Sequence, residues 1–388
     1  MYEPSRPAQE ARIGAARAHF FDNGNAPTEL LSTPIMRSWT RCRSTGLDAS
    51  VPVEFEPIGR ARQVECGERH EELRRIAEPA ATRLASAVIA ARHMVLITDA
   101  DGIVVSALGD ASRVSRTLQL LARQGVDVSE RAIGTNSMGT ALRERAPVAV
   151  TGAEHYCQTN GRLVCMAAPL FLPDGKIAGT IDVTGDYDNS APPLAAPVIG
   201  AARMIEIGLF LATQRDKLLL QFAWDTTDLA SKDAGWLAFD DLGQLTGATS
   251  TARLLLGLGD GTIHAQFESL FHQSFCVPLR ALSKDAPIQL RTPHGFVFAA
   301  RVLRAGMDEP VLAAEARQLP SPINGTGSHE EHIACASTGA STTLRQMSAH
   351  HAREMVEAEG GNKLRAALRL GISRSTLYRL LLSTGENY

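Results

Sequence analysis

Two Asp-Gly turns, each set between runs of β-branched and aliphatic residues, constrain the fold of this chain more than any other feature. The first is Asp101-Gly102 in MVLITDADGIVVSAL, and the second is Asp174-Gly175 in VCMAAPLFLPDGKIAGTIDVT. Asp-Gly between such runs is typical of a β-hairpin, because the tight turn needs residues that adopt positive φ. Two hairpins separated by helical segments predict an antiparallel sheet flanked by helices, which is an α+β domain.

Helical patterns surround both hairpins. Residues 71–92 place apolar side chains on one stripe and predict an amphipathic helix, which Pro79 kinks by removing one hydrogen bond. Shorter helices are expected at 115–123 and 135–145, and a long closing helix at 197–222. This order of strands and flanking helices is typical of a sensor-type domain.

A second, smaller α+β unit is predicted over 228–305. A strand at 236–240, a turn around Gly243 and a further strand precede a helix at 251–257, and two more strands lie on either side of Gly295. The residues between that helix and the last two strands are poorly patterned.

Three helices are predicted at the C-terminus, at 343–358, 363–370 and 374–382. Gly371 is suited to the left-handed residue that ends the second helix, and Ser373 to the N-cap of the third. A short helix, a glycine-containing turn and a helix with basic and hydroxyl residues on its outer face form the helix-turn-helix layout. That layout places its last helix in the major groove of DNA.

The side chains on this outer face suit a DNA duplex. The planar fork of arginine binds guanine O6 and N7, and hydroxyl groups fix phosphates. Residues 341–388 hold seven Lys and Arg against four Asp and Glu, so this segment is basic although the whole chain has a formal charge of -3. The candidate DNA-binding residues are Asn362, Lys363, Ser373, Arg374, Ser375, Thr376, Tyr378 and Arg379.

The remaining stretch, 306–342, is rich in Gly, Pro, Ser and Thr and predicts a flexible linker. The predicted divisions are an N-terminal helical region at 1–70, a sensor domain at 71–222, a second domain at 228–305, the linker at 306–342 and a DNA-binding domain at 343–388.

Several strings resemble one family of bacterial regulators. GGN…AA…LGISRSTLYR is similar to the Fis-type helix-turn-helix of enhancer-binding proteins. IMRSWTRCRSTGLD, VLITDADGIVVS, IGTNSMGTALRERAPVAVTGAEHY and AAPLFLPDGKIAGTIDVTGDY resemble the sensory half of acetoin-catabolism-regulator (AcoR-like) activators. The resemblance implies that 71–222 is a GAF domain for a small organic effector, that 228–305 is a PAS-like module, and that the protein acts as a homodimer.

One departure from this family concerns the mechanism. Its members carry a central AAA+ ATPase between the sensor and the DNA-binding domain, whereas this chain has only the linker 306–342 there. No GxxxxGK[ST] phosphate loop and no GAFTGA string occurs in the sequence. We therefore expect no ATP hydrolysis and no remodelling of sigma-54 polymerase. A repressor, a co-regulator beside a full-length paralogue, and an activator that recruits RNA polymerase directly all remain possible.

The GAF resemblance also implies a ligand pocket between the sheet and its loops. An apolar cleft with a few polar groups would fix a small ketone, diol or alcohol. Asn136 also suits the N-cap of the helix that follows it, and Asp182 also suits a turn. The candidate ligand-binding residues are Thr135, Asn136, His155, Cys165 and Asp182.

Two competing functions stay open. Cys157 and Cys165 are the candidate pair for a GAF-type cysteine redox enzyme, and the sensor half alone could capture a full-length sigma-54-dependent activator without touching DNA. The spacing of His155, Cys157 and Cys165 matches no recognised metal site, so neither metal nor cofactor is expected. With no apolar run long enough for a membrane span and no signal peptide pattern, we expect a cytoplasmic protein that is not an enzyme.

Overall fold

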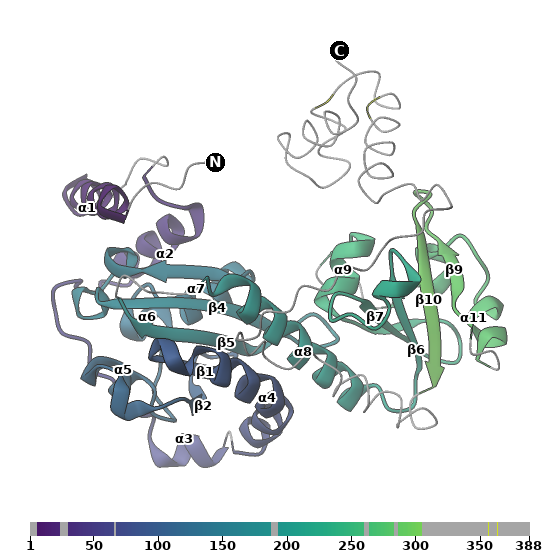
Figure 1. Cartoon of the computed structure of the whole chain (residues 1–388), viewed down its shortest axis with the longest axis horizontal. Coiled ribbons are helices and arrows are strands. Elements are labelled where there is room, and N and C mark those ends of the chain that lie inside the picture. The colour runs from purple at the N-terminus through teal and green to yellow at the C-terminus, as the bar shows by residue number, and fades with distance from the viewer. Residues whose placement is uncertain are drawn as a thin grey trace, which may run out of the picture. The chain divides into compact units, whose positions relative to one another are not determined.

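The computed structural model describes residues 6–23, 30–65, 67–187, 193–259, 264–282 and 286–304, together with Val356 and Lys363. The chain divides into two units, Met1–Pro322 and Ile323–Tyr388. The first unit contains two lobes, each built on an antiparallel sheet (Figure 1). The three predicted C-terminal helices lie outside the described residues, except that Val356 and Lys363 are each helical.

The first sheet confirms both predicted hairpins. Its strand order is β2-β1-β5-β4-β3, and every neighbouring pair is antiparallel. Gly102 and Gly175 turn the hairpins with φ of +86° and +84°, the backbone region that glycine adopts without strain. The strands are β1 His93–Asp99, β2 Val104–Leu108, β3 Val148–Thr151, β4 Leu163–Phe171 and β5 Ile177–Asp186.

Helices cover both faces of this sheet. On one face α4 and α8 pack together against strand residues such as Ile97 and Val183, and Pro79 lies inside α4 as expected. On the other face α1, α2, α5, α6 and α7 enclose a second apolar cluster that includes Leu96, Val150 and Trp39. The helices of this lobe are α1 Arg6–Asn23, α2 Thr33–Ser44, α3 Arg60–Glu65, α4 Gly67–Val88, α5 Arg116–Leu121, α6 Glu130–Ile133, α7 Ser137–Glu144 and α8 Ala195–Thr213, with short 3-10 turns at η1 Ile89–Ala91, η2 Ala111–Arg113, η3 Gly152–Glu154 and η4 Gln158–Asn160.

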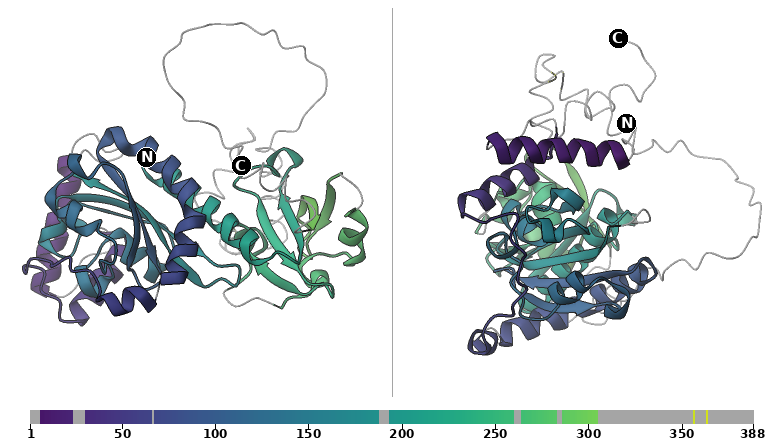
Figure 2. Two further views of the ribbon diagram at one scale, coloured as in Figure 1. Left: turned by 90° about the horizontal axis from the view of Figure 1, so that it is seen from below. Right: turned by 90° about the vertical axis from the view of Figure 1, so that its left-hand side faces the viewer.

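The N-terminal helices α1 and α2, from the region predicted as separate, contribute to the core of the first lobe. Phe20 and Trp39 are fully buried there, with ring centroids 5.2 Å apart. Figure 2 shows α1, drawn in purple, lying over this lobe.

The second sheet has the order β8-β7-β6-β10-β9, again antiparallel throughout. Phenylalanine side chains from the sheet and from the helices that cover it fill one face, and Phe239, Phe267 and Phe275 contact one another. The strands are β6 Leu218–Ala223, β7 Gly235–Phe239, β8 Leu245–Ala248, β9 Ile288–Arg291 and β10 Val297–Arg304, and the helices are α9 Ser250–Leu256, α10 Phe267–Leu270 and α11 Cys276–Ala281, with the 3-10 turn η5 Thr226–Asp228.

The predicted helix at 197–222 is wrong at its end. α8 stops at Thr213, and Leu218–Ala223 forms β6, the central strand of the second sheet. The run LLLQF is apolar except for Gln221, and such a run suits a buried strand as well as a helix. Because β6 pairs with β7 on one side and β10 on the other, all six of its residues are buried.

α8 belongs to both lobes. Its first turns pack against β4 and α4, whereas Phe210 near its end packs against Leu219 and Trp236 of the second sheet. By length and composition it is the one described helix that could span a membrane, with 39% of its apolar window buried. It also carries the buried Glu206, and its packing on two sheets is that of a core helix.

Candidate functional site

A group of polar side chains is buried in the first lobe, on the sheet face that α1, α2 and α7 cover. Because Ile181 and Val183 point to the opposite core, Asp182 and Thr184 face this side of β5. Cys165 lies opposite Thr184 in the register of β4 and β5. We call Ser137, His155, Cys165, Asp182 and Thr184 the buried polar cluster; each is at most 2% exposed.

Asp182 is the centre of the cluster. Ser137 Oγ donates to Asp182 Oδ1 at 2.5 Å, and Thr184 Oγ1 donates to Oδ2 at 2.5 Å. Burial raises the pKa of Asp182 to about 7, although both hydroxyl groups favour the carboxylate and work in the opposite direction. A carboxyl group with such a pKa changes its charge near neutrality, which is unusual for a residue that serves packing alone.

His155 and Cys165 form the other half of the cluster. His155 Nδ1 donates to the Gly152 carbonyl at 2.9 Å, because a carbonyl can only accept. Burial lowers the pKa of His155 to about 4, so the ring is neutral and its Nε2 accepts from the Cys165 thiol at 3.4 Å. Burial, reinforced by the charge of Asp182, raises the pKa of Cys165 well above its usual value.

Thr135 and Asn136 lie beside the cluster but have structural partners. The Oγ1 of Thr135 is 2.7 Å from Ser38 Oγ of α2. Asn136 caps α7 by accepting from the Gly139 amide at 2.9 Å, and its own amide donates to the Val128 and Gly134 carbonyls. The N-cap alternative for Asn136 is therefore confirmed, whereas the turn alternative for Asp182 is wrong because Asp182 lies within β5.

Two N-terminal helices hold the loop that carries His155. Arg17 of α1 donates to the carbonyls of His155 at 2.8 Å and Tyr156 at 2.7 Å. Trp39 of α2 donates through Nε1 to the Glu154 carbonyl at 2.7 Å. The guanidinium of Arg17 also lies over the Phe21 ring, 4.9 Å from its centroid. These contacts close the cluster off from solvent.

Ion pairs fix α2 against the helices below it. Arg41 Nε lies 2.6 Å from Glu130 of α6, and its Nη1 lies 2.7 Å from Glu144 of α7. Hydrogen bonds to Glu130 raise the pKa of Arg41 against the opposing effect of burial. The helix that covers the cluster is thus tied to α7, the helix that supplies Ser137.

Sequence reasoning missed Ser137, Thr184 and Arg17. Thr184 carried a usable signal, since it lies two residues after Asp182 in a strand and therefore on the same face. Ser137 follows the capping Asn136 directly. Arg17 carried no signal, because its partners are more than a hundred residues away in the sequence.

The cysteine pair considered for redox chemistry is buried. Cys157 and Cys165 are both buried, and burial raises the pKa of Cys157 to about 11. A nucleophilic cysteine needs a lowered pKa and exposure, and these two residues have neither. Within the described residues, no group of three His, Cys, Asp or Glu side chains is placed to hold a metal ion.

The candidate DNA-binding residues lie outside the described residues, with the exception of Lys363, which is helical and exposed. Their positions relative to DNA therefore stay a prediction from sequence.

Two family models match this chain. The model described as the MimR N-terminal domain matches residues 8–206, just over half of the chain. The model described as bacterial regulatory protein, Fis family, matches residues 344–381. The first match includes α1 and α2 together with the sheet that carries the buried polar cluster.

Several curated relatives are named as regulatory proteins or transcriptional activators. The acetoin catabolism regulatory protein of Cupriavidus necator is 31% identical over 61% of this chain and 37% of its own length. The acetoin dehydrogenase operon transcriptional activator AcoR of Bacillus subtilis is 28% identical over 52% of this chain and 33% of its own length. The propane 2-monooxygenase operon transcriptional activator MimR of Mycolicibacterium smegmatis is 28% identical over 49% of this chain and 32% of its own length.

The chain thus spans about a third of the length of these relatives. Among solved structures, the Escherichia coli DhaR(N)-DhaL complex contains a similar chain, with a TM-score of 0.44 and 15% identity over 70% of this chain and 99% of that one. The resemblance to AcoR-like regulators drawn from the sequence is confirmed by the two family models and these relatives. The chain belongs to the family of transcriptional regulators that carry the MimR N-terminal domain, here joined to a Fis-family segment.

Proposed function

We propose that this protein is a sequence-specific DNA-binding regulator that responds to a small organic effector without hydrolysing ATP. The observation that carries the proposal is the presence, in one chain, of the MimR N-terminal domain and a Fis-family segment. A cytoplasmic homodimer would suit such a protein, because a two-fold dimer matches the symmetry of two DNA half-sites.

DNA contact is assigned to the C-terminal segment. Arg374 and Arg379 would contact bases, and the neighbouring hydroxyl groups of Ser375, Thr376 and Tyr378 would contact phosphates. The basic character of residues 341–388 supports this assignment.

The buried polar cluster is the proposed effector site. A GAF-like first lobe would present Asp182, His155 and Cys165 to a ligand that replaces their present hydrogen bonds. The neutral His155 and the high pKa of Asp182 favour an uncharged ligand over an anion. The names of the relatives concern acetoin and propane oxidation operons, which is consistent with a ketone, diol or alcohol as effector. Thr135 and Asn136 would shape the site rather than bind through their side chains.

We propose that the protein does not hydrolyse ATP, and the support comes from the segment between the two family matches, residues 207–343. The strands of the second sheet lie between Leu218 and Arg304, and we propose a PAS-like role for this lobe. The predicted linker follows it. No phosphate-binding loop occurs in the sequence. Repression, co-regulation beside a full-length paralogue, or direct recruitment of RNA polymerase would each proceed without nucleotide.

The route from the effector site to the second lobe runs through the β4–β5 hairpin. These two strands carry Cys165 and Asp182, and the turn between them contacts the second lobe. The Pro173 carbonyl accepts from the Ala248 amide at 3.0 Å and from Arg253 Nη2 at 3.0 Å. A change at the cluster that shifts either strand would therefore reach α9.

Glu206 of α8 forms a second connection. Its buried carboxyl group accepts from the Phe171 amide at the end of β4 and from the amide and hydroxyl of Ser250 at the start of α9. Burial raises the pKa of Glu206 to about 7. In this proposal the signal passes through α8, Glu206 and the β4–β5 hairpin, since the long helix predicted at 197–222 ends at Thr213.

A ligand screen followed by a DNA-binding measurement tests the proposal. Small ketones, diols and alcohols are screened for a rise in melting temperature, because a ligand that binds only the folded state stabilises it. The best ligand is then added to the protein on promoter DNA without nucleotide. We expect a change in DNA affinity of about five- to 150-fold, the usual range of allosteric coupling. A ligand that stabilises the protein yet leaves DNA affinity unchanged would refute the regulatory proposal.

A further inference from the structure

The helix α7 reaches from the buried polar cluster to the turn between β4 and β5, residues 172–176. Its first residue, Ser137, donates to Asp182 within the cluster at 2.5 Å. At its other end, Arg145 Nη2 donates to the Gly175 carbonyl in the turn at 2.7 Å. Between these two contacts the helix packs along β4 and β5. One short helix therefore contacts both the cluster and the turn that meets the second lobe.

Arg145 ends α7 in a backbone conformation that favours glycine. Its φ of +53° lies in the left-handed region, where many helices place a glycine after their last turn. An arginine in this conformation is strained, and such strain persists where other contacts offset it. The side chain makes two contacts there: the bond to Gly175, and a guanidinium that lies 5.1 Å from the centroid of the Phe171 ring. Glycine would supply neither contact.

Residues of the second lobe hold the same turn. The Pro173 carbonyl accepts from the Ala248 amide of β8 and from Arg253 Nη2, each at 3.0 Å. A Cβ atom added at Gly175 would lie 3.1 Å from Arg253 Cζ, so this guanidinium packs against the residue that Arg145 binds. The turn therefore receives one arginine side chain from each lobe.

α7 has more freedom to shift than the strands beside it. Asp182 lies in β5, which pairs with β1 on one side and with β4 on the other, so two ladders fix its backbone. The backbone bonds of a helix are internal, and α7 is attached to its surroundings by side chains such as those of Ser137, Glu144 and Arg145. A ligand that replaces the bond between Ser137 and Asp182 would therefore shift α7 without breaking the sheet.

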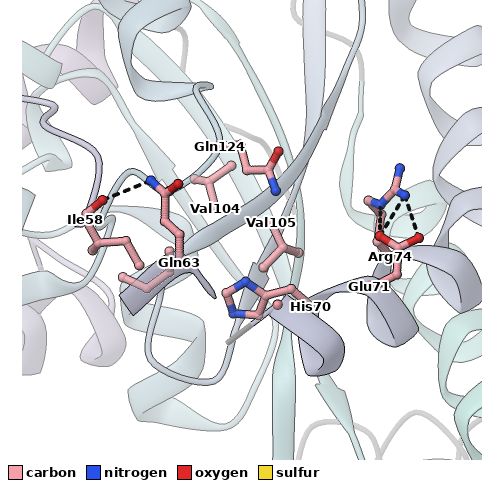
Figure 3. Close-up of a pocket in the computed structure, with 11 residues that line it drawn as sticks. Ile58, Gln63, His70, Glu71, Arg74, Val104, Val105 and Gln124 are labelled. Atoms are coloured by element: carbon pink, nitrogen blue, oxygen red, sulfur yellow. Dashed lines mark hydrogen bonds and ion pairs between the residues drawn. The ribbon is translucent and has the colours of Figure 1, made fainter. Parts of the chain in front are cut away.

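The cavity drawn in Figure 3 lies elsewhere in the first lobe. It borders β2, and among the described residues none that line it belongs to α7 or to the β4–β5 turn. Its charged side chains have partners, since Arg74 pairs with Glu71 and His70 with Asp99. Because β1 separates β2 from β5 in the sheet, Gln124 on the wall of this cavity is a control position outside the connection.

We propose that α7 transmits changes at the buried polar cluster to the second lobe, with Arg145 as the positioning residue that holds the β4–β5 turn against β8. A ligand that separates Asp182 from Ser137 would shift α7, and Arg145 would move the turn with it. The bond that Ala248 donates to the turn would then weaken. The signalling role rests on the proposed effector site, whereas the mechanical connection is measurable without ligand or DNA.

Hydrogen–deuterium exchange of the Ala248 amide in the full-length protein measures this connection. Ser137→Ala removes the bond that α7 makes to Asp182, and Thr184→Ala removes the bond of equal length that β5 makes to the same carboxyl group. These variants form a matched pair, because each takes one hydroxyl group from Asp182. We expect Ser137→Ala to accelerate exchange at Ala248 roughly three- to tenfold, the effect of one weakened hydrogen bond. Thr184→Ala should leave it within about twofold of the unmodified protein.

Arg145→Gly tests the positioning role. Glycine adopts the left-handed backbone at the end of α7 without strain, so this variant removes only the side chain. It should accelerate exchange at Ala248 by a similar factor, and Ser137→Ala added to it should cause no further increase. Arg143→Ala, at an exposed arginine of the same helix, and Gln124→Ala should exchange as the unmodified protein does.

Three results would overturn the proposal. The first is acceleration by Thr184→Ala as large as that by Ser137→Ala, which would assign the connection to the strands. The second is acceleration by Ser137→Ala that persists in the Arg145→Gly protein. The third is an Ala248 amide that no variant affects, or one that accelerates only together with the Leu245 amide at the other end of β8. A failed effector screen would leave this measurement unchanged, and any of these three results would leave the effector site in place.

Discussion

At the scale of single residues, sequence reasoning found the positions of the cluster but not their partners. His155, Cys165 and Asp182 were predicted to lie together, and the structure places them on one buried face of the first sheet. Thr135 and Asn136 were predicted with them, yet their side chains bond to α2 and to the start of α7. The cause is local, because the first amide groups of a helix lack partners within it. A side chain directly before the helix can accept hydrogen bonds from these amides.

The buried carboxyl group of Asp182 makes stability depend on pH. Its pKa is about 7 in the folded protein and about 4 in the unfolded chain, so between these values the folded state holds a proton that the unfolded state has lost. The free energy of unfolding contributed by this group therefore falls as pH rises from about 4 to about 7. Asp182→Asn removes this dependence, and its stability relative to the unmodified protein should improve with pH by up to about 1.4 kcal/mol per pH unit.

Urea unfolding of the two proteins at a pH near 5 and at a pH near 8 measures this difference. Glu206 titrates in the same direction but is present in both proteins, so its contribution cancels. A stability difference that is the same at both pH values would show that Asp182 is ionised in the folded state throughout.

The buried thiols should react slowly with alkylating reagents. Cys42, Cys157 and Cys165 are buried, and burial raises the pKa of each, whereas Cys276 is exposed. Iodoacetamide at mildly alkaline pH should modify Cys276 well before these three, because the thiolate is the reacting form. Peptide mapping by mass spectrometry gives the order of labelling. Early labelling of Cys165 would revive the redox alternative.

At the scale of helices and strands, local signals predicted the hairpins and most helices. Asp-Gly turns marked both hairpins of the first sheet, and apolar periodicity marked α4. The end of α8 was missed because LLLQF has no period that separates a buried strand from a helix. Its pairing with β7 and β10 decides the outcome, and β10 is about eighty residues further along the chain.

Among the contacts between secondary-structure elements, we expect the attachment of α1 to the loop that carries His155 to matter most for the buried polar cluster. Arg17→Ala removes two hydrogen bonds to the loop that carries His155, and it should lower the free energy of unfolding by about 1–3 kcal/mol. Hydrogen–deuterium exchange of residues 152–157 should accelerate. Asp22→Ala, an exposed change on the same helix, should stay within about 0.5 kcal/mol of the unmodified protein. Equal exchange in both variants would mean that α1 does not close the cluster.

At the scale of the whole molecule, the sequence predicted the order of parts better than their connections. The two α+β lobes and the Fis-family match follow the predicted order. The contacts that join the lobes are centred on Glu206 and Arg253, and no sequence motif marks either residue. These contacts form only when the β4–β5 turn packs against α9. Such contacts depend on the packing of entire lobes, which local sequence does not encode.

Loss of Arg253 should uncouple the two lobes. Arg253 is 9% exposed and reaches the Pro173 carbonyl, so Arg253→Ala should cost about 1–3 kcal/mol. We expect calorimetry to show one transition for the unmodified chain and separate transitions for the two lobes of the variant. Arg215→Ala, which removes only an exposed contact to Ala212 at the end of α8, is the control. Coincident transitions in the Arg253 variant would place the coupling elsewhere.

The central claim is that this chain binds DNA through its last residues, and fluorescence anisotropy on the DNA upstream of its own coding region tests it most directly. We predict nanomolar to micromolar affinity without nucleotide, with the logarithm of the binding constant falling linearly with the logarithm of salt concentration. Arg374→Ala or Arg379→Ala should cost about 1–3 kcal/mol and relax specificity at one base pair. Absence of salt-dependent binding, or binding that both variants leave unchanged, would contradict the account.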